Sequence, residues 1–251
     1  MAPDVVLLHG FTGSCRSFDF VSEALSRGGV TPIPVDLPGH GKRSGEIAAS
    51  LFSLQSVFQS IAKASAVAPV SLVGYSMGGR LALQYAAAYP ERVSRLVLES
   101  SSPGLDTDEE RMKRREADAS LAHRIRQGGV EAFVDEWEAL PLFSSQTELP
   151  REIQETIRTN RLANSPRSLA AALEGFGTGS LPSLWGQIPT VTVPTLVLVG
   201  GLDAKFVEIG ERMAGALPNA RLTRFDSVGH AIHLEDPSGW IDAVIPFLLP
   251  G

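Results

Sequence analysis

A serine with one glycine two residues before it and another two residues after it lies in Gly74-Tyr75-Ser76-Met77-Gly78. This G-x-S-x-G spacing is typical of a sharp turn from a buried strand into a helix, which exposes the serine hydroxyl for nucleophilic chemistry. The apolar run before the turn and the small-residue segment after it supply such a strand and helix. The pattern alone is weak, so its meaning depends on whether a base and an orienting carboxylate follow it.

Both partners follow the serine, and each comes directly after an apolar run. Asp203 follows the run Thr195–Val199, and His230 follows the run Leu222–Phe225. The order Ser, Asp, His at the ends of successive strands predicts a catalytic triad. His233 is the competing base three residues later, and we expect it to have a packing or rim role instead.

The segment after the first apolar run is the candidate for an oxyanion hole. His9-Gly10-Phe11 follows the run Val5–Leu8, and the glycine would let backbone N–H groups turn toward the site. We expect the donors to be the N–H groups of Phe11 and Met77, with His9 in a structural role. His40, in a Gly- and Pro-rich loop, is interpreted as a loop anchor.

Short runs rich in Val, Leu and Ile recur along the chain with helical segments between them. Nearly continuous apolar runs suit strands buried on both faces of a parallel sheet. Helical patterns between such strands predict right-handed crossovers and a doubly wound α/β fold. One of these helices should carry the stripe Leu51, Leu54, Phe58 and Ile61. The predicted strands are Val5–Leu8, Thr31–Val35, Val70–Val73, Leu96–Leu98, Thr195–Val199 and Leu222–Phe225.

The alternation stops near Ser102, and the next part of the chain is charged and helical in pattern. We therefore predict a helical cap over residues 105–182, inserted between core segments 1–104 and 183–251. A cap in this position would cover the carboxyl ends of the strands, where open α/β sheets bind their ligands.

Composition limits the classes of partner. The 251 residues carry a formal net charge of −6, which argues against nucleic acid or an anionic membrane as the main partner. The single cysteine, Cys15, excludes an internal disulfide and a multi-thiolate metal site, and is interpreted as a small loop residue. No signal peptide and no apolar run of membrane-spanning length is found, so a cytoplasmic location is expected.

Three arginines suggest what the site binds. Arg80 lies four residues after the serine and should face the same side of the helix. Arg114 falls within an apolar stripe of a predicted cap helix, where a charge needs a partner or a cavity, and Asp118 at i+4 is the ordinary partner. Arg161 lies in a second cap helix. Together they favour a substrate with several carboxylates, because guanidinium binds carboxylate bidentately.

The segments HGF, DLPGHG, GYSMGG, GGLD and GH occur in this order and resemble the α/β-hydrolase superfamily over almost the whole chain. The superfamily hosts several kinds of chemistry, so the motifs alone do not assign a reaction. The segments GYSMGGR, SSPGLDTDEERMKRREAD, VDEWEALPLF, RLANSP and GGLDAKF look more specifically like the MenH family, the 2-succinyl-6-hydroxy-2,4-cyclohexadiene-1-carboxylate synthases of menaquinone biosynthesis.

This resemblance implies that Arg80, Arg114 and Arg161 hold the carboxylates of the substrate, and that Tyr75 and Trp137 also bind it. It implies a lyase that eliminates pyruvate from 2-succinyl-5-enolpyruvyl-6-hydroxy-3-cyclohexene-1-carboxylate, with the triad serine as base. No cofactor and no metal are expected. Three neighbours crowd the same cap helix and could replace Arg114 in this role: Arg111, Arg115 and Arg124.

Two other interpretations stay open at this point. The same triad could act through an acyl-enzyme on Ser76, as in a carboxylesterase or a C–C bond hydrolase. A non-catalytic receptor could also keep the fold and use the arginines only for recognition. The number of subunits is not indicated by the sequence.

Overall fold

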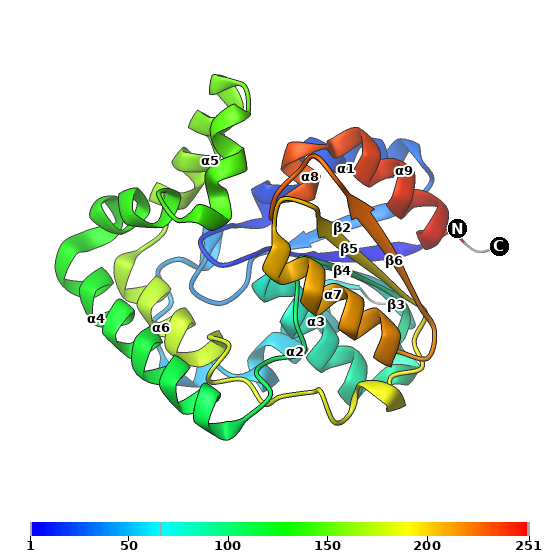
Figure 1. Ribbon diagram of the computed structural model, residues 1–251, viewed down its shortest axis with the longest axis horizontal. Helices are drawn as coiled ribbons and strands as arrows, with labels where there is room; N and C mark the ends of the chain where they lie inside the picture. Colours follow the sequence, from blue (N-terminus) through cyan, green and yellow to red (C-terminus); the bar gives the residue numbers. More distant parts are fainter. Residues whose placement is uncertain (1, 66, 250–251) are drawn as a thin grey trace.

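Six parallel strands form the centre of the molecule, in the spatial order β2-β1-β3-β4-β5-β6 (Figure 1). The computed structural model describes residues 2–65 and 67–249. All five neighbouring strand pairs in this sheet are parallel. The strands are β1 (Asp4–Leu8), β2 (Thr31–Val35), β3 (Val70–Tyr75), β4 (Val93–Glu99), β5 (Thr195–Gly200) and β6 (Ala220–Phe225).

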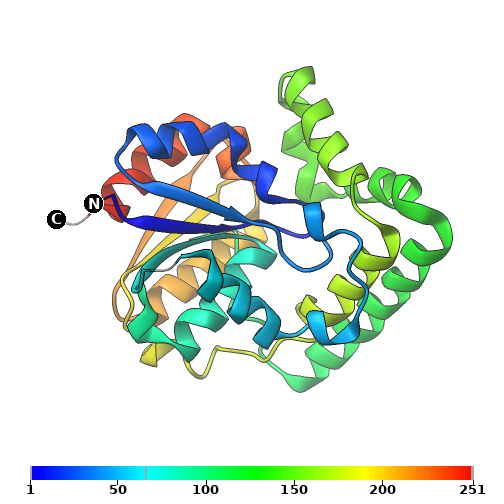
Figure 2. The same cartoon turned by 180° about the vertical axis from the view of Figure 1, so that it is seen from behind.

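Helices cover both faces of this sheet and its carboxyl edge (Figures 1 and 2). The α-helices are α1 (Asp19–Arg27), α2 (Leu54–Ala64), α3 (Met77–Ala88), α4 (Asp108–Glu138), α5 (Arg151–Leu162), α6 (Pro166–Phe176), α7 (Ala204–Ala216), α8 (Ile232–Glu235) and α9 (Pro237–Leu248). The 3-10 helices are η1 (Cys15–Phe18), η2 (Gly41–Arg43), η3 (Ala49–Leu51), η4 (Pro90–Arg92), η5 (Pro141–Glu148) and η6 (Ile188–Thr190).

Alternate residues of β1 show how the sheet forms two cores. Val6 and Leu8 join the core under α2, α3 and α7, whereas Val5 and Leu7 join the core under α1 and α9. Successive side chains of a strand point to opposite faces, so an unbroken apolar run buries both faces at once. Each fully buried Val or Leu contributes about 1.5–3 kcal/mol relative to an exposed one. The predicted doubly wound α/β fold is therefore confirmed.

The edge strands differ from the prediction that all the strands are buried on both faces. Every residue of β5 is buried, but β2 and β6 are partly exposed along their length. Each edge strand has one neighbour in the sheet, so water reaches it from the free side.

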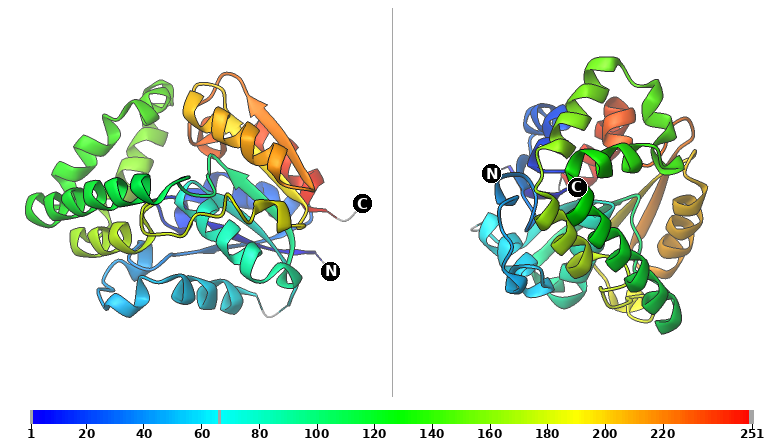
Figure 3. Two further views of the ribbon diagram at one scale, coloured as in Figure 1. Left: turned by 60° about the horizontal axis from the view of Figure 1, so that its bottom comes forward. Right: turned by 90° about the vertical axis from the view of Figure 1, so that its left-hand side faces the viewer.

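Helices α4, α5 and α6, which come between β4 and β5 in the chain, lie beyond the carboxyl ends of the strands, on the side of the molecule opposite the termini (Figures 1 and 3). Helix α4 begins with a capping box, in which Thr107 and Glu110 satisfy each other's backbone N–H groups. Gly129 interrupts the helix with a φ of 82°, which turns its second half. Apolar residues of both halves of α4 then pack on α6 in a separate small core.

One predicted helix starts later than its apolar stripe indicated. Leu51 lies in η3, and α2 begins at Leu54 because the Ser53 side chain accepts the backbone N–H of Ser56 as an N-cap. Val57 and Ile61 are the buried residues of this helix.

Candidate active site

Ser76 lies at the junction of β3 and α3 with a φ of 51° and a ψ of −111°. Such a backbone conformation is strained for a residue with a side chain, and it persists because the surroundings fix it. A Cβ atom at Gly78 would lie 2.0 Å from the carbonyl oxygen of Leu8, so this turn can approach β1 only with glycine there. The predicted strand-to-helix turn is therefore present, with the serine hydroxyl outside the sheet.

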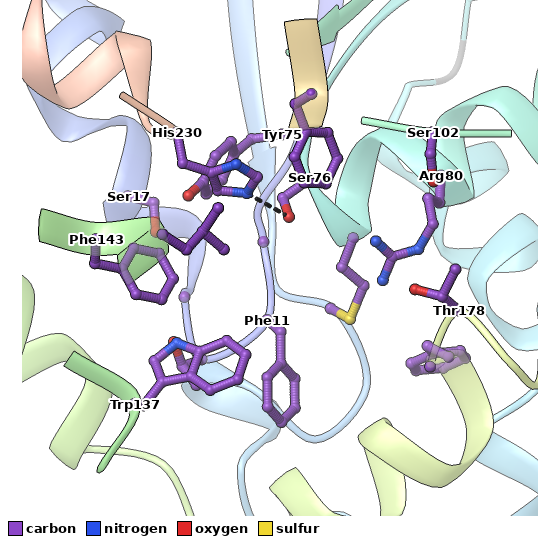
Figure 4. Close-up of a pocket in the computed structure, with 18 of the residues that line it drawn as sticks. Phe11, Ser17, Tyr75, Ser76, Arg80, Ser102, Trp137, Phe143, Thr178 and His230 are labelled. Carbon is purple, nitrogen blue, oxygen red and sulfur yellow. Dashed lines mark hydrogen bonds between the residues drawn. The ribbon is translucent and has the colours of Figure 1, made fainter. Parts of the chain in front are cut away.

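The structure brings Ser76, His230 and Asp203 together from three separate segments, and Figure 4 shows the contact between Ser76 and His230. The Oγ of Ser76 lies 3.0 Å from Nε2 of His230, and Nδ1 of His230 lies 2.6 Å from Oδ2 of Asp203. Both His230 and Asp203 are buried. With Nδ1–H donating to the carboxylate, Nε2 carries the lone pair that can accept the serine proton.

Asp203 and His230 each lie in a segment that follows a strand, and hydrogen bonds fix each segment. Asp203 follows β5 and is the N-cap of α7, where its Oδ1 accepts the backbone N–H of Phe206 at 3.4 Å. His230 follows β6. The carboxylate of Glu235 accepts the N–H groups of Gly229 and Ala231, on either side of His230, at 2.6 and 3.1 Å.

Phe11 and Met77, whose N–H groups were predicted to form the oxyanion hole, line the same cavity as Ser76. Within the described part of the chain, neither group donates a hydrogen bond to another protein group. Met77 is the first residue of α3, so its N–H is one of those that a helix leaves without an internal partner. The two groups are available to an oxygen that becomes negatively charged during a reaction.

The serine opens into a cavity of about 210 Å³ between the strand ends and the helices of residues 105–182. The sheet side contributes Gly10, Ser76 and His230, and the helical side contributes Trp137 and Arg161. A reacting molecule in this cavity would therefore touch both parts of the chain.

Arg80 extends into this cavity from the first turn of α3 (Figure 4). Across residues 2–65 and 67–249, no carboxylate lies within ion-pair distance of it, and its Nε has no hydrogen-bond partner. Burial and the neighbouring charge of Arg114 lower the pKa of Arg80 to about 10, so it is still a cation at neutral pH. A partly buried cation without an ion-pair partner is costly, and a bound anion would offset that cost.

Arg114 also lines the cavity, but it has a partner. Its Nε donates to Oδ1 of Asp118 at 2.8 Å, as the i+4 spacing predicted. Burial raises the pKa of Asp118 although Arg114 opposes this effect. Oδ2 of Asp118 has no partner within the described residues.

The three neighbouring arginines of α4 are not among the described residues that line the cavity. Arg111 pairs with Asp108 at 2.9 Å, and Arg124 lies 3.8 Å from Glu136. Of the four arginines considered for this position, Arg114 is the one that lines the cavity among the described residues.

Arg161 is buried at the wall of the cavity and already has protein partners. It donates to Glu138 and to Gln146, each at 3.0 Å, and its guanidinium lies 4.9 Å from the ring centre of Phe143. The side chain is therefore oriented firmly before any ligand binds, in contrast to Arg80.

The two aromatic residues predicted from the resemblance both line the cavity. The ring of Tyr75 lies between His230 and His233, with ring centres 5.4 and 4.8 Å away. Burial, followed by the charge of Glu99, raises the pKa of Tyr75 well above its usual value, so its hydroxyl stays protonated. Trp137 packs on Phe11, and its buried Nε1–H has no partner among the described residues.

His233 does not reach the serine. It is fully buried, its Nδ1 lies 2.7 Å from Oε1 of Glu99, and the other oxygen of that carboxylate accepts the Nε1–H of Trp240 at 2.9 Å. The packing role predicted for His233 is consistent with these contacts. Glu99 also accepts the N–H of Ser76 with its backbone oxygen, so it supports the serine turn directly.

The sequence interpretation missed Glu99, Glu235 and Gln146. The first two act on backbone groups near Ser76 and His230, and no residue spacing signals such contacts. An acidic residue five positions after His230 was visible, but its role depends on a turn that brings it back to that loop. Gln146 belongs to η5, whose position follows from the break in α4.

Two further sequence predictions can be compared with the structure. Cys15 was interpreted as a loop residue but is the first residue of η1; it is half-buried, and its N–H donates to Asp36 at 2.7 Å. His40 is buried, and its Nδ1 lies 3.1 Å from the carbonyl oxygen of Pro38 in its own loop.

Neither a metal cluster nor a membrane-spanning helix is found in residues 2–65 and 67–249. No group of three or more His, Cys, Asp and Glu side chains there could hold a metal ion. No helix there is both long and apolar enough to cross a membrane.

A parallel doubly wound sheet with a serine at a strand-to-helix turn, followed by an aspartate and a histidine at later strand ends, defines an α/β hydrolase. Residues 3–237 match the family model described as alpha/beta hydrolase fold. The fold class inferred from the sequence motifs is confirmed.

Relatives narrow the class further. A Bacillus subtilis (strain 168) protein, provisionally named 2-succinyl-6-hydroxy-2,4-cyclohexadiene-1-carboxylate synthase, is 42% identical over 97% of this chain and 89% of its own length. A Salmonella heidelberg (strain SL476) protein named as that synthase is 30% identical over 98% of this chain and 94% of its own. The solved structure of MenH from S. aureus has a TM-score of 0.91 at 38% identity, covering 98% of this chain and 93% of that one. The chain belongs to the 2-succinyl-6-hydroxy-2,4-cyclohexadiene-1-carboxylate synthase family, as its motifs predicted.

Proposed function

We propose that this chain is a carbon–oxygen lyase that eliminates pyruvate from 2-succinyl-5-enolpyruvyl-6-hydroxy-3-cyclohexene-1-carboxylate, a step of menaquinone biosynthesis. The product is 2-succinyl-6-hydroxy-2,4-cyclohexadiene-1-carboxylate, the compound for which the relatives are named. The observation that carries this proposal is the position of Arg80, a cation without a carboxylate partner among the described residues, in the same cavity as Ser76. A plain esterase has no need of such a charge beside its serine.

The proposed reaction begins with proton transfer through the triad. His230 takes the hydroxyl proton of Ser76 while Asp203 stabilises the resulting imidazolium. The serine oxygen then removes the ring proton at C2, which is acidic because it lies next to the succinyl ketone. The ketone oxygen becomes an enolate oxygen, and the N–H groups of Phe11 and Met77 stabilise its charge.

The electron pair from C2 then moves through the ring. The electron pair left at C2 forms the double bond C2=C3, and the pair of the former C3=C4 double bond forms C4=C5. The bond from C5 to the enolpyruvyl oxygen breaks at the same time, and its electron pair leaves with the oxygen. The departing enolpyruvate takes up a proton, which His230 can return through Ser76, and forms pyruvate. No acyl-enzyme is formed in this sequence.

We assign the remaining cavity residues to substrate binding. Arg80, Arg114 and Arg161 would hold the carboxylates of this small polycarboxylate, and Tyr75 and Trp137 would donate further hydrogen bonds. Charge-assisted bonds from guanidinium are about twice as strong as neutral ones. Residues 105–182 would act as the cap that supplies two of the three arginines and limits the access of water.

Ester hydrolysis is the alternative that one observation favours. A serine 3.0 Å from His230, in a cavity lined by Phe11 and Met77, whose N–H groups have no protein partner among the described residues, could also form an acyl-enzyme with a small activated ester. We therefore expect weak esterase activity from the same triad, without dependence on the arginines.

The test is to measure pyruvate release from the enolpyruvyl substrate with a coupled lactate dehydrogenase assay, beside hydrolysis of a neutral nitrophenyl ester. We expect a kcat/KM for elimination of about 10⁵ M⁻¹s⁻¹ or above, much higher than for the ester. The Ser76→Ala variant should lose both activities. Fast ester hydrolysis without pyruvate release would overturn the proposal in favour of the esterase.

A further inference from the structure

We propose that His9 is a positioning residue that orients the peptide group between Gly10 and Phe11, so that the N–H of Phe11 faces the reacting oxygen. The inference rests on the oxyanion hole of the proposed function, and it holds for elimination and for ester hydrolysis alike. Neither the family match nor the arrangement of the triad assigns this role to His9.

The contacts of His9 determine which of its ring nitrogens carries the hydrogen. The backbone N–H of Leu37 donates to Nε2 at 3.0 Å, so Nε2 must hold a lone pair. Burial lowers the pKa of His9 to about 4, and the ring is therefore neutral at pH 7. The hydrogen is then on Nδ1, which lies 2.8 Å from the carbonyl oxygen of Gly10 and donates to it.

The Gly10 carbonyl and the Phe11 N–H belong to one planar peptide group. In a trans peptide these two bonds point in opposite directions, so a donor that holds the oxygen also sets the direction of the N–H. The N–H of Gly13 donates to the same oxygen at 3.1 Å, and the two donors together fix it. The Phe11 N–H then points away from His9 and is left without a protein partner in the described residues.

Gly10 cannot hold this orientation by its own packing. A Cβ atom there would lie 2.7 Å from Cε1 of Tyr75, so the position must be glycine. Glycine is the residue with the fewest backbone restrictions, and a peptide group next to it needs an external support. The buried imidazole supplies that support, and it is backed by the ring of His40 at 5.0 Å.

Two substitutions separate the proposed role from ordinary loop support. The side-chain nitrogen of His9→Asn can take the place of Nδ1 and donate to the Gly10 carbonyl, but Asn cannot reach the Leu37 N–H. The side-chain oxygen of His9→Gln can take the place of Nε2 and accept from Leu37, but it removes the imidazole donor and leaves the Gly10 carbonyl held by the Gly13 N–H alone. The two variants therefore each keep one of the two bonds.

We expect His9→Gln to lower kcat about 100-fold, because loss of one oxyanion donor costs about 10²–10³ in rate. His9→Asn should stay within about tenfold of the wild type. KM should change less than threefold in both, because the hole acts on the transition state. The proposal is overturned if His9→Gln is as active as His9→Asn, or if the loss appears in KM.

Measurement with both the enolpyruvyl substrate and the neutral ester keeps the two proposals distinguishable. A wild-type protein that hydrolyses the ester but releases no pyruvate would contradict the lyase proposal, and the ester kcat of the variants would still test His9. Should either variant fail to fold, the wild type gives an independent result. Its ¹⁵N-labelled histidine spectrum should show the Nδ1–H tautomer of His9 between pH 6 and 8, and the Nε2–H tautomer would overturn the inference.

Discussion

Arg80 and Arg114 lie close enough for the charge of Arg114 to lower the pKa of Arg80, yet Asp118 forms an ion pair with Arg114 and acts on Arg80 only at longer range. Asp118 satisfies Nε of Arg114 at 2.8 Å, whereas Nε of Arg80 is buried without a partner. Two adjacent cations repel each other, and a dianionic ligand between them would remove that repulsion. The closeness of these two guanidinium groups therefore favours a ligand with more than one carboxylate.

Arg80→Met should separate the two activities, because it removes the charge and keeps a long side chain. We expect kcat/KM for pyruvate elimination to fall about 10- to 150-fold, since a charge-assisted hydrogen bond to a ligand contributes about 1.5–3 kcal/mol. Hydrolysis of a neutral ester should change less than threefold. Arg221→Met, an exposed arginine on β6, is the matched control and should leave both reactions unchanged.

The same variant should be more stable than the wild type in the absence of substrate. Removal of a partly buried, unpaired charge should raise the free energy of unfolding by about 1 kcal/mol. Urea unfolding of Arg80→Met and wild type measures this difference. A clear loss of stability would mean that Arg80 has a structural partner, and it would count against a role in binding.

Asp203→Asn tests the orientation of His230. The Asn oxygen should stay with the Phe206 N–H, which places the amide nitrogen against Nδ1 of His230. That contact would force the hydrogen of His230 onto Nε2, and the ring could no longer accept the serine proton. We expect kcat to fall about 10³-fold or more for elimination and for ester hydrolysis.

Asp242→Asn, an exposed aspartate of α9, is the control for this change and should leave kcat unaltered. Circular dichroism should show native structure in both variants. An Asp203→Asn variant within tenfold of the wild type would mean that His230 does not act as the base.

The buried imidazoles of His9 and His40 predict a loss of stability in mild acid. Burial lowers the pKa of His9 to about 4, and burial together with the charge of His9 lowers that of His40 to about 3, whereas both are near 6.5 when unfolded. The unfolded chain therefore binds more protons below pH 6.5, and stability falls as the pH decreases. The loss for His9 should reach about 3 kcal/mol by pH 4, since one pKa unit corresponds to about 1.4 kcal/mol.

Urea unfolding at several pH values between 7 and 4 measures this slope. His40→Asn can keep a donor to the Pro38 carbonyl but has no proton to gain, so its stability should vary less with pH than that of the wild type. A wild-type curve that is flat between pH 6.5 and 4 would contradict the prediction.

Most of the sheet could be predicted from the sequence because the central strands are buried on both faces. The predicted runs Val5–Leu8 and Thr195–Val199 are each one residue shorter than the central strands β1 and β5. The edge strand β2 also matches its predicted run, Thr31–Val35, although it is partly exposed. β4 was predicted as Leu96–Leu98 and extends from Val93 to Glu99. Ser94 and Arg95 interrupt its apolar run, while the pairing with β3 continues through Arg95.

The site was predictable where it depends on motifs at strand ends. Ser76, Asp203 and His230 each follow an apolar run, and a parallel sheet places all such ends at one edge. The protein partners of the cavity arginines were not predictable in this way. Arg161 meets Glu138 and Gln146 only because α4 turns at Gly129 and carries the following segment back over the cavity. Contacts of this kind depend on the tertiary path of the chain rather than on local spacing.

Glu235→Gln tests the support of the loop that carries His230. The carboxylate accepts the N–H groups of Gly229 and Ala231 at 2.6 and 3.1 Å, but a glutamine offers one acceptor oxygen and turns an N–H₂ group toward the other donor. A buried donor without a partner costs about 1–3 kcal/mol, so we expect the free energy of unfolding to fall by that amount. We also expect kcat to fall about tenfold for elimination and for ester hydrolysis, with KM unchanged, because His230 would be held less firmly against Ser76.

Glu208→Gln, an exposed position on α7, is the matched control and should leave stability and kcat unchanged. Equal kcat values for Glu235→Gln and wild type would show that the loop is held without this carboxylate.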